Sequence, residues 1–325
     1  MDSVIIVTPG SGRSKATVSA HMKAAVYTKA KIGRVLEMKD LERPVPKNNE
    51  VVMRVRAASI NPLDWRMKSH RPGVDVAGQV AAVGGAVTQF KLGDAVFGLC
   101  KGAFAEYACT HEAKLVRKPE SLSFDQAAAI PVAGLTALQG LRDKGHLQPG
   151  QKVLINGAAG GVGTFAVQIA KSFGANVTGV CSTKNVELVR SLGADRIIDY
   201  TCDDFTQDSE RYDLLLDNVG NRTLSAMRRV LGPNGKCVMA GAPKELWAVL
   251  TRLLKAFAWS QFIRQKFKFF IAKMNRDDLT TLCELIKAGK LIPEIDRRYP
   301  LDETADALAY AEEGHARAKV LIAFQ

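Results

Sequence analysis

One stretch decides the fold: Val153-Leu-Ile-Asn-Gly157-Ala-Ala-Gly160-Gly161-Val-Gly163, a buried strand and a glycine-rich turn followed by a helix through Phe165–Ala170. In such a turn the backbone N–H groups and the N-terminus of the helix face a pyrophosphate. Glycines are needed because a Cβ atom would block its approach. A glycine triplet alone is a weak signal, but here a strand and a helix flank it. The stretch therefore predicts a dinucleotide site formed by Gly157, Ala159, Gly160, Gly161, Val162 and Gly163.

Strands and helices alternate around this turn. After Phe124 the predicted strands are Lys152–Asn156, Asn176–Cys181, Arg196–Asp199, Leu214–Asp217 and Lys236–Ala240. Helices are expected from the turn through Ser172 and over Asn185–Leu192. This alternation predicts a doubly wound parallel sheet, the Rossmann arrangement.

The rest of the chain has a different pattern. Between Met22 and Pro119 short β-rich runs such as Val51–Ala57 and Val76–Val80 are separated by Gly, Pro, Asn and Asp turns. They predict a mostly-β domain. Near the end, a helix over Leu279–Ala288 and a closing strand over Lys319–Phe324 are expected to rejoin it.

Length supports two domains, because 325 residues exceed the size at which one core stops growing, roughly 250 residues. The predicted organisation is an N-terminal extension (1–21), a mostly-β catalytic domain (22–127), a Rossmann cofactor-binding domain (128–275) and a C-terminal return to the catalytic domain (276–325). The extension is basic, so a targeting peptide is an alternative, although it lacks the apolar core of a secretory signal.

Composition narrows the class of protein. The hydrophobic share of 47% and the charged share of 24% are ordinary for a soluble globular protein. Six cysteines occur without any C-x-x-C pair, which indicates reduced thiols and a cytoplasmic location. The net charge of +12 would suit a polyanion, but no nucleic-acid reading motif accompanies it. An anionic cofactor or a membrane surface explains the charge more economically, and no nucleic-acid partner is expected.

The end of the second strand indicates which dinucleotide is bound. An NAD site normally carries Asp or Glu there, about 20 residues beyond the loop. This chain has Gly179-Val-Cys-Ser182-Thr183-Lys184, which contains hydroxyls and a lysine but no carboxylate. A 2′-phosphate would be held by such donors and repelled by an acid. The segment therefore predicts NADPH, although Lys184 could instead be a solvated residue at the start of the next helix.

At these residues the chain resembles the zinc-independent quinone oxidoreductase branch of the medium-chain dehydrogenase/reductase family, in particular its plastid-envelope and mitochondrial members. The resemblance runs from Met22 to the C-terminus and implies a GroES-like catalytic domain in front of the Rossmann domain. Its landmarks include Ser59-Ile-Asn61-Pro-Leu-Asp64-Trp65, Gly73-Val-Asp75-Val-Ala-Gly78, Gly93-Asp94-Ala-Val-Phe97, Gly102-Ala-Phe-Ala-Glu106-Tyr107, Ala133-Gly-Leu-Thr136-Ala, Leu192-Gly-Ala-Asp195 and Asp217-Asn-Val-Gly220.

Zinc members of this family carry a Gly-His-Glu run and a cysteine, where this chain has Gly73-Val74-Asp75 and Asn61. Catalytic zinc needs three side-chain ligands, and two of the expected three are missing. The cysteine cluster of a structural zinc site is missing from Lys101–Ala108 as well. No metal site is therefore expected.

The resemblance also implies roles for individual residues, each with a simpler alternative. Thr136 would lie near the nicotinamide and Asn61 near the reacting end. Arg66 is a further candidate at the acceptor, though a surface arginine is the simpler interpretation. Asn61 could instead be a turn residue before Pro62, Thr136 an ordinary helix residue and Tyr200 a packing aromatic. Asp64 is expected to be structural. The residues implied at the cofactor are Ser182, Thr183, Lys184 and Tyr200 around the 2′-phosphate, and Asn218, Gly220, Ala240 and Gly241 along the ribose and nicotinamide.

Without a metal, hydride transfer to a plain ketone lacks a Lewis acid, whereas a quinone or an enone can delocalise the charge. The implied function is an NADPH-dependent reductase of quinones or α,β-unsaturated carbonyls. The alternative is a catalytically weak NADPH-binding protein that acts as a redox-responsive partner or membrane-associated factor. Arg317-Ala318-Lys319 replaces an Arg-Gly-Lys run that the resemblance predicts, so Arg317 is not assigned to the cofactor site.

The segment 244–276 combines basic and aromatic residues on a helical period. In related dehydrogenases the corresponding stretch covers the acceptor pocket or lies at a subunit interface, so a homodimer contact or a lid is expected. Peripheral membrane contact is the alternative.

Overall fold

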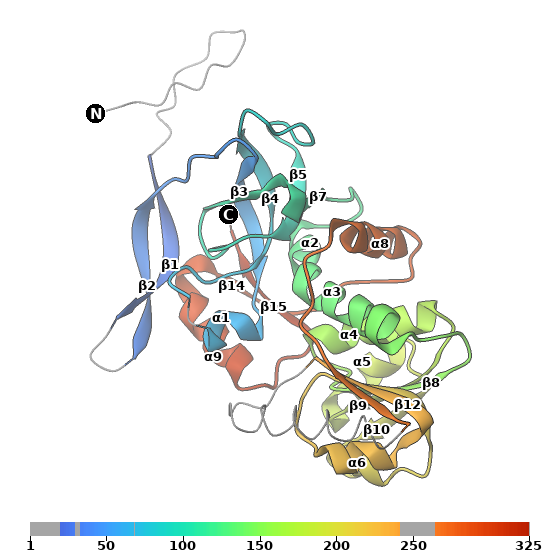
Figure 1. Cartoon of the computed structure of the whole chain (residues 1–325). Coiled ribbons are helices and arrows are strands. Elements are labelled where there is room, and N and C mark those ends of the chain that lie inside the picture. Colours follow the sequence, from blue (N-terminus) through green and yellow to red (C-terminus); the bar gives the residue numbers. More distant parts are fainter. Residues whose placement is uncertain (1–19, 30–32, 68, 241–263, 325) are drawn as a thin grey trace.

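The computed structural model describes residues 20–29, 33–67, 69–240 and 264–324. They form two sheet-containing domains and a separate two-stranded hairpin (Figure 1). Within these ranges, no helix is both long and apolar enough to span a membrane.

The cofactor-domain sheet is parallel throughout, in the order β10-β9-β8-β11-β12-β13. Its strands are β8 (Lys152–Asn156), β9 (Asn176–Cys181), β10 (Arg196–Asp199), β11 (Tyr212–Asp217), β12 (Leu231–Met239) and β13 (Lys266–Phe269). The order runs outward in both directions from β8 and β11, so the winding reverses between these two strands. A ligand crevice is expected there, at the carboxyl ends of the strands. The predicted doubly wound sheet is confirmed.

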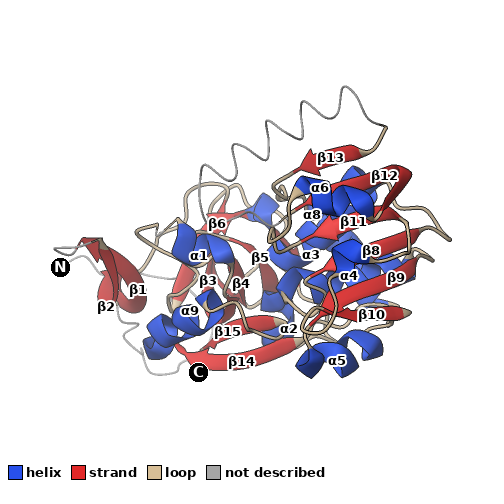
Figure 2. Ribbon diagram, turned by 90° about the horizontal axis from the view of Figure 1, so that it is seen from below, coloured by secondary structure: helices blue, strands red, loops and turns tan. Residues whose placement is uncertain are grey.

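Helices cover both faces of this sheet (Figure 2). They are α3 (Pro131–Gln139), α4 (Gly161–Ser172), α5 (Val186–Ser191) and α6 (Leu224–Arg229). Helix α8 (Arg276–Lys287) packs against α3 and against strand β7. The apolar side of α4, with Phe165 and Ile169, is fully buried in the core. That packing fixes the glycine turn at the start of α4 against the end of β8.

The first domain is built around a seven-stranded sheet in the order β14-β15-β3-β4-β5-β7, with β6 paired to β3. Its strands are β3 (Glu50–Ser59), β4 (Asp75–Val83), β5 (Ala95–Leu99), β6 (Tyr107–His111), β7 (Leu115–Arg117), β14 (Ile295–Pro300) and β15 (Lys319–Ala323). Its helices are α1 (Pro62–Arg66), α2 (Phe124–Ala129) and α9 (Thr304–Glu312), and the separate hairpin is β1 (His21–Lys29) with β2 (Arg34–Glu42). The expected return of the closing strand is confirmed, because β15 pairs with β3.

Two expectations near the C-terminus were wrong. The helical interpretation of 244–276 fails at Lys266–Phe269, which is the edge strand β13, with Phe267 buried in the core. Helix α8 begins at Arg276 rather than Leu279, because the Asn275 side chain caps it by accepting from the N–H of Asp277 at 2.9 Å. Residues 241–263 lie outside the described residues.

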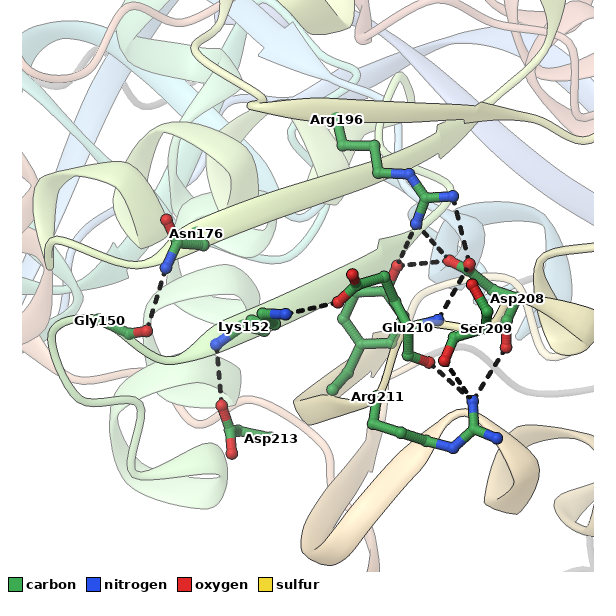
Figure 3. Close-up of polar contacts among 10 residues, drawn as sticks. Gly150, Lys152, Asn176, Arg196, Asp208, Ser209, Glu210, Arg211 and Asp213 are labelled. Atoms are coloured by element: carbon green, nitrogen blue, oxygen red, sulfur yellow. Dashed lines mark hydrogen bonds and ion pairs between the residues drawn. The ribbon is translucent and has the colours of Figure 1, made fainter.

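Polar groups tie together the amino ends of the parallel strands, at the edge opposite the glycine turn (Figure 3). Arg196 donates from both terminal nitrogens to Asp208, at 2.5 and 3.2 Å, and the Tyr212 hydroxyl donates to the same carboxylate at 2.7 Å. The N–H of Lys152 donates to Asp213 at 2.9 Å. These groups satisfy one another at the amino ends of the strands.

Candidate functional site

The turn between β8 and α4 is shaped for close approach of a ligand to its backbone. Gly157 has a φ of +79°, a conformation that side-chain-bearing residues rarely adopt. A Cβ atom on Gly163 would lie 2.0 Å from the carbonyl oxygen of Gly157, so only glycine fits there. Gly160 is the N-cap of the twelve-residue helix α4, whose first N–H groups face away from the helix body. Ala159 is buried and Val162 half-buried beside them.

The end of β11 supplies polar groups at the same edge. The fully buried Asp217 accepts from Asn156 on β8 at 2.9 Å and from the N–H of Gly220 at 3.0 Å, which fixes the loop after the strand. This loop presents Asn218, whose carboxamide nitrogen and oxygen are both buried and have no hydrogen-bond partner within the described residues. A buried, unsatisfied carboxamide is costly unless a ligand completes it. The glycine cradle and Asn218 together fit a dinucleotide.

The predicted 2′-phosphate residues lie at the ends of two neighbouring strands. Ser182 and Thr183 follow β9, and Tyr200 follows β10 with 52% of its surface exposed. Lys184 is also exposed, so its side chain is accessible to a ligand. The simpler interpretation of Tyr200 as a packing aromatic is not supported by this exposure.

A carboxylate that the sequence reasoning missed stands in this group. Asp199 ends β10 and pairs in register with Cys181 of β9, one residue before Ser182. Hydrogen bonds from Thr183 and Thr201 hold the pKa of Asp199 below its usual value. The position lies on the third strand, outside the segment in which an NAD-type acid is sought.

Asn61 is the centre of a buried network on the first domain, with 3% of its surface exposed. Its side-chain nitrogen donates to Asp75 Oδ2 at 2.9 Å and to the Ser59 carbonyl at 3.3 Å. Its side-chain oxygen accepts from Lys319 Nζ at 2.8 Å. Both amide hydrogens are therefore engaged within the protein. Ser59 also donates to Asp75, at 2.7 Å.

Asp64 holds the backbone around Asn61 in place through hydrogen bonds to its carboxylate. Its carboxylate accepts from the N–H of Asn61 at 2.8 Å and from the N–H of Gly73 at 2.9 Å, which agrees with the expected structural role. Burial raises the pKa of Asp64 to about 7, against the lowering effect of those two donors, and nearby Asp75 adds to the rise.

The remaining predicted residues are spread around the crevice. The Thr136 hydroxyl donates to the Val132 carbonyl at 2.7 Å within α3, so it behaves as an ordinary helix residue here. Arg66 is exposed at the end of α1. Ala240 follows β12, and its N–H donates to the Asp217 carbonyl at 3.0 Å. Gly241 lies outside the described residues.

Lys319 was not singled out from the sequence, yet it joins the two halves of the site. Its ammonium donates to Asn61 Oδ1 and, at 2.9 Å, to the Ile60 carbonyl, and lies 3.6 Å from Asp75 Oδ2. Burial lowers the pKa of Lys319, and Asp75 opposes this effect. The only signal in the sequence was the Arg317-Ala318-Lys319 run. Arg317 itself is exposed, and its N–H donates to Asp296 at 2.9 Å.

The described residues contain no group of three or more His, Cys, Asp or Glu side chains that could hold a metal ion. Zinc independence remains a prediction, as do the homodimer and the membrane contact.

Comparison with known proteins agrees with this geometry. The alcohol dehydrogenase GroES-like domain matches residues 47–120, and the zinc-binding dehydrogenase family matches residues 192–322. A chloroplast envelope quinone oxidoreductase homolog of Arabidopsis thaliana is 33% identical, over 88% of this chain and 93% of its own length. A chloroplastic NADPH-dependent alkenal/one oxidoreductase of the same plant is also 33% identical, over 94% and 81%.

Among solved structures, the quinone oxidoreductase from Coxiella burnetii superposes with a TM-score of 0.83 at 30% identity, covering 94% of this chain and all of that one. The likeness therefore extends through both domains. The chain belongs to the quinone oxidoreductase-like branch of the medium-chain dehydrogenase/reductase family, whose members are NAD(P)H-dependent oxidoreductases.

Proposed function

We propose that the protein transfers a hydride from NADPH, without zinc, to a quinone or an α,β-unsaturated carbonyl. The observation that carries this proposal is the juxtaposition of a glycine cradle with the Asn61 network. A backbone bridge pairs Gly160 with Ala318, and Lys319 then reaches Asn61. The names of the relatives, which include quinone and alkenal/one reductases, support the same substrate class.

The residues present would hold the cofactor along the carboxyl edge of the sheet. The N–H groups at the start of α4 would meet the pyrophosphate, and Asn218 would meet the ribose or nicotinamide end. Bound NADPH supplies the hydride. The protein then has to orient the acceptor next to it, exclude water and balance the charge that develops on the acceptor oxygen.

We infer that Asn61 orients the segment 60–66, called the acceptor loop below, rather than donating to the acceptor oxygen, because Asp75 and the Ser59 carbonyl engage both of its amide hydrogens. The exposed Arg66 remains a candidate donor, whereas the N–H groups of Ile60, Asn61 and Asp64 already donate within the protein. A conjugated acceptor suits such a site because the negative charge that forms when hydride adds to it is delocalised.

The preference for NADPH over NADH rests on Ser182, Thr183, Lys184 and Tyr200, which offer hydroxyl and ammonium donors beside the end of β9. Asp199 favours NADH instead, because a carboxylate near the end of β9 favours an unphosphorylated ribose. We propose that the donors dominate.

Steady-state NADPH oxidation against a panel of quinones, enones and saturated ketones tests the function. We expect turnover with the conjugated acceptors and little with the ketones. Tight NADPH binding with no turnover on any acceptor would instead support the catalytically weak, partner-associated alternative. That alternative is not favoured by the activities for which the relatives are named.

A further inference from the structure

We propose that Lys319 is a positioning residue for hydride transfer. Through Asn61 it holds the acceptor loop against the glycine turn 157–163, called the cofactor loop here. This inference rests on the proposed function and deepens it. Lys319 is almost fully buried, with 3% of its surface exposed, at the first position of β15.

Contacts at the start of β15 connect it to the cofactor loop. The N–H of Ala318 donates to the Ala159 carbonyl at 2.8 Å. The aliphatic stem of Lys319 covers the start of α4, where a Cβ atom on Gly161 would lie 3.0 Å from Lys319 Cδ. Neither contact needs the charge of the side chain.

The charged end of Lys319 connects the same residue to the acceptor loop. Its ammonium lies 2.8 Å from Asn61 Oδ1 and 2.9 Å from the Ile60 carbonyl. Because an ammonium can only donate, it requires the oxygen of the Asn61 amide to face it. The amide nitrogen then faces Asp75, which accepts at 2.9 Å.

Asp75 extends this arrangement to a fourth element. Its second oxygen accepts from the N–H of Val132, near the start of α3, at 3.0 Å. The buried ammonium thus contacts the turn after β3 and Asp75 of β4, and it is connected to α3 of the cofactor domain through Asp75. Because removal of one partner from a buried ion pair leaves an uncompensated charge, the geometry of this network depends on the ammonium.

The test compares two charge deletions, Lys319→Met and Arg196→Met. The first substitution keeps an apolar stem at the position but removes the ammonium. Arg196 pairs with the buried Asp208 at the opposite edge of the sheet (Figure 3), so R196M is a matched control for lost stability. All measurements are made well below both unfolding temperatures.

We expect K319M to lower kcat about 10- to 100-fold, since a displacement of about 1 Å at a reacting centre can cost a hundredfold. The KM for NADPH should change less than about threefold, because the stem still covers Gly161. R196M should leave kcat unchanged. Equal losses of kcat in both variants, or a kcat of folded K319M within twofold of wild type, would overturn the proposal.

A double-mutant cycle with Asn61→Ala separates positioning from general destabilisation. If Lys319 acts through Asn61, adding K319M to N61A should lower kcat little further, whereas multiplicative losses would refute that route. Should K319M not fold, Lys319→Arg takes its place, because it keeps the charge but moves its hydrogens. K319R is expected to fold and to have a lower kcat than wild type.

Hydrogen exchange of the peptide 57–66 in the absence of NADPH is independent of turnover. K319M should speed exchange in this peptide, and R196M should not. If the exchange rate of this peptide is unchanged in K319M, Lys319 does not hold the acceptor loop in place. This conclusion does not depend on whether the protein has reductase activity. Failure of the acceptor panel with wild type, by contrast, would count against the proposed function alone.

Discussion

The N–H of Ala318 donates to the carbonyl of Ala159 at 2.8 Å, so the strand that closes the first domain begins on the phosphate loop of the second. Ala318 makes this contact with a φ of +66°, in the left-handed region that favours glycine. An alanine in this conformation carries backbone strain, because its Cβ atom crowds the following carbonyl oxygen.

We expect Ala318→Gly to stabilise the protein. Relief of the left-handed strain, about 1–2 kcal/mol, exceeds the entropy cost of glycine, about 0.5–1 kcal/mol. The net gain of about 0.5–1 kcal/mol should raise Tm by roughly 1–2 °C in calorimetry, given the size of the chain. Ala323→Gly, at the other end of β15, serves as the control and should lower Tm. A fall in Tm for A318G would show that the conformation is not strained.

Lys184→Ala should raise the KM for NADPH about 10- to 100-fold with little effect on NADH, because an ion-paired hydrogen bond is typically worth about 1.5–3 kcal/mol. Steady-state kinetics with both cofactors measure the ratio. Lys152→Ala removes the same charge at the far edge of the sheet and should leave the ratio unchanged. An unaltered NADPH/NADH ratio in K184A would remove Lys184 from the phosphate site.

Asp199→Asn should act in the opposite direction and lower the KM for NADPH several-fold, because it removes a carboxylate beside Thr183 at the same strand ends. The KM for NADH should stay the same or rise. If NADPH and NADH respond equally, the 2′-phosphate does not lie near Asp199.

Activity should survive exhaustive chelation, because Val74 and Asn61 stand where zinc ligands are expected and the described residues hold no other ligand cluster. The measurement is NADPH oxidation after EDTA dialysis, with metal content checked on the same sample. Loss of turnover after dialysis, restored by added zinc, would contradict the prediction that the enzyme works without zinc.

Asp64 should make stability fall as the pH rises through neutrality. Its folded pKa of about 7 exceeds the unfolded value of about 3.9, so between these values the folded state binds the extra proton. This contribution is complete below pH 4, is lost on approaching pH 7, and amounts to up to about 4 kcal/mol. Urea unfolding of wild type and Asp64→Asn from pH 5 to 8 should show the steeper decline in wild type. Parallel profiles would place the pKa of Asp64 near its ordinary value.

Local patterns predicted the cofactor domain well. Asn176–Cys181 and the helix ending at Ser172 have the predicted limits, because strand and helix periods and the glycine turn are properties of neighbouring residues. The strand at Lys266–Phe269 was missed because its local pattern is too short to be informative. Its alternation of Lys and Phe spans only four residues, too few to separate a strand from a helix.

The candidate site was predicted in its parts but not in its connections. Gly157 and Asn218 followed from the loop and the resemblance, whereas the link from Lys319 to Asn61 joins positions 258 residues apart. Nothing in a single sequence marks a lysine for burial, since lysines are almost always exposed. Only the folded arrangement shows that its ammonium is enclosed by Asp75 and Asn61.

The place of β15 between β14 and β3 has a consequence for biosynthesis. The first domain emerges from the ribosome early but lacks a central strand until Lys319–Ala323 has been synthesised. Until then the Ala57–Ser59 end of β3 lacks the partner that β15 provides, and an unpaired strand edge is a surface that recruits other strands. The cofactor domain, whose described strands all lie between Lys152 and Phe269, can complete its sheet sooner. Nascent chains are therefore expected to depend on chaperones chiefly through the domain that is translated first.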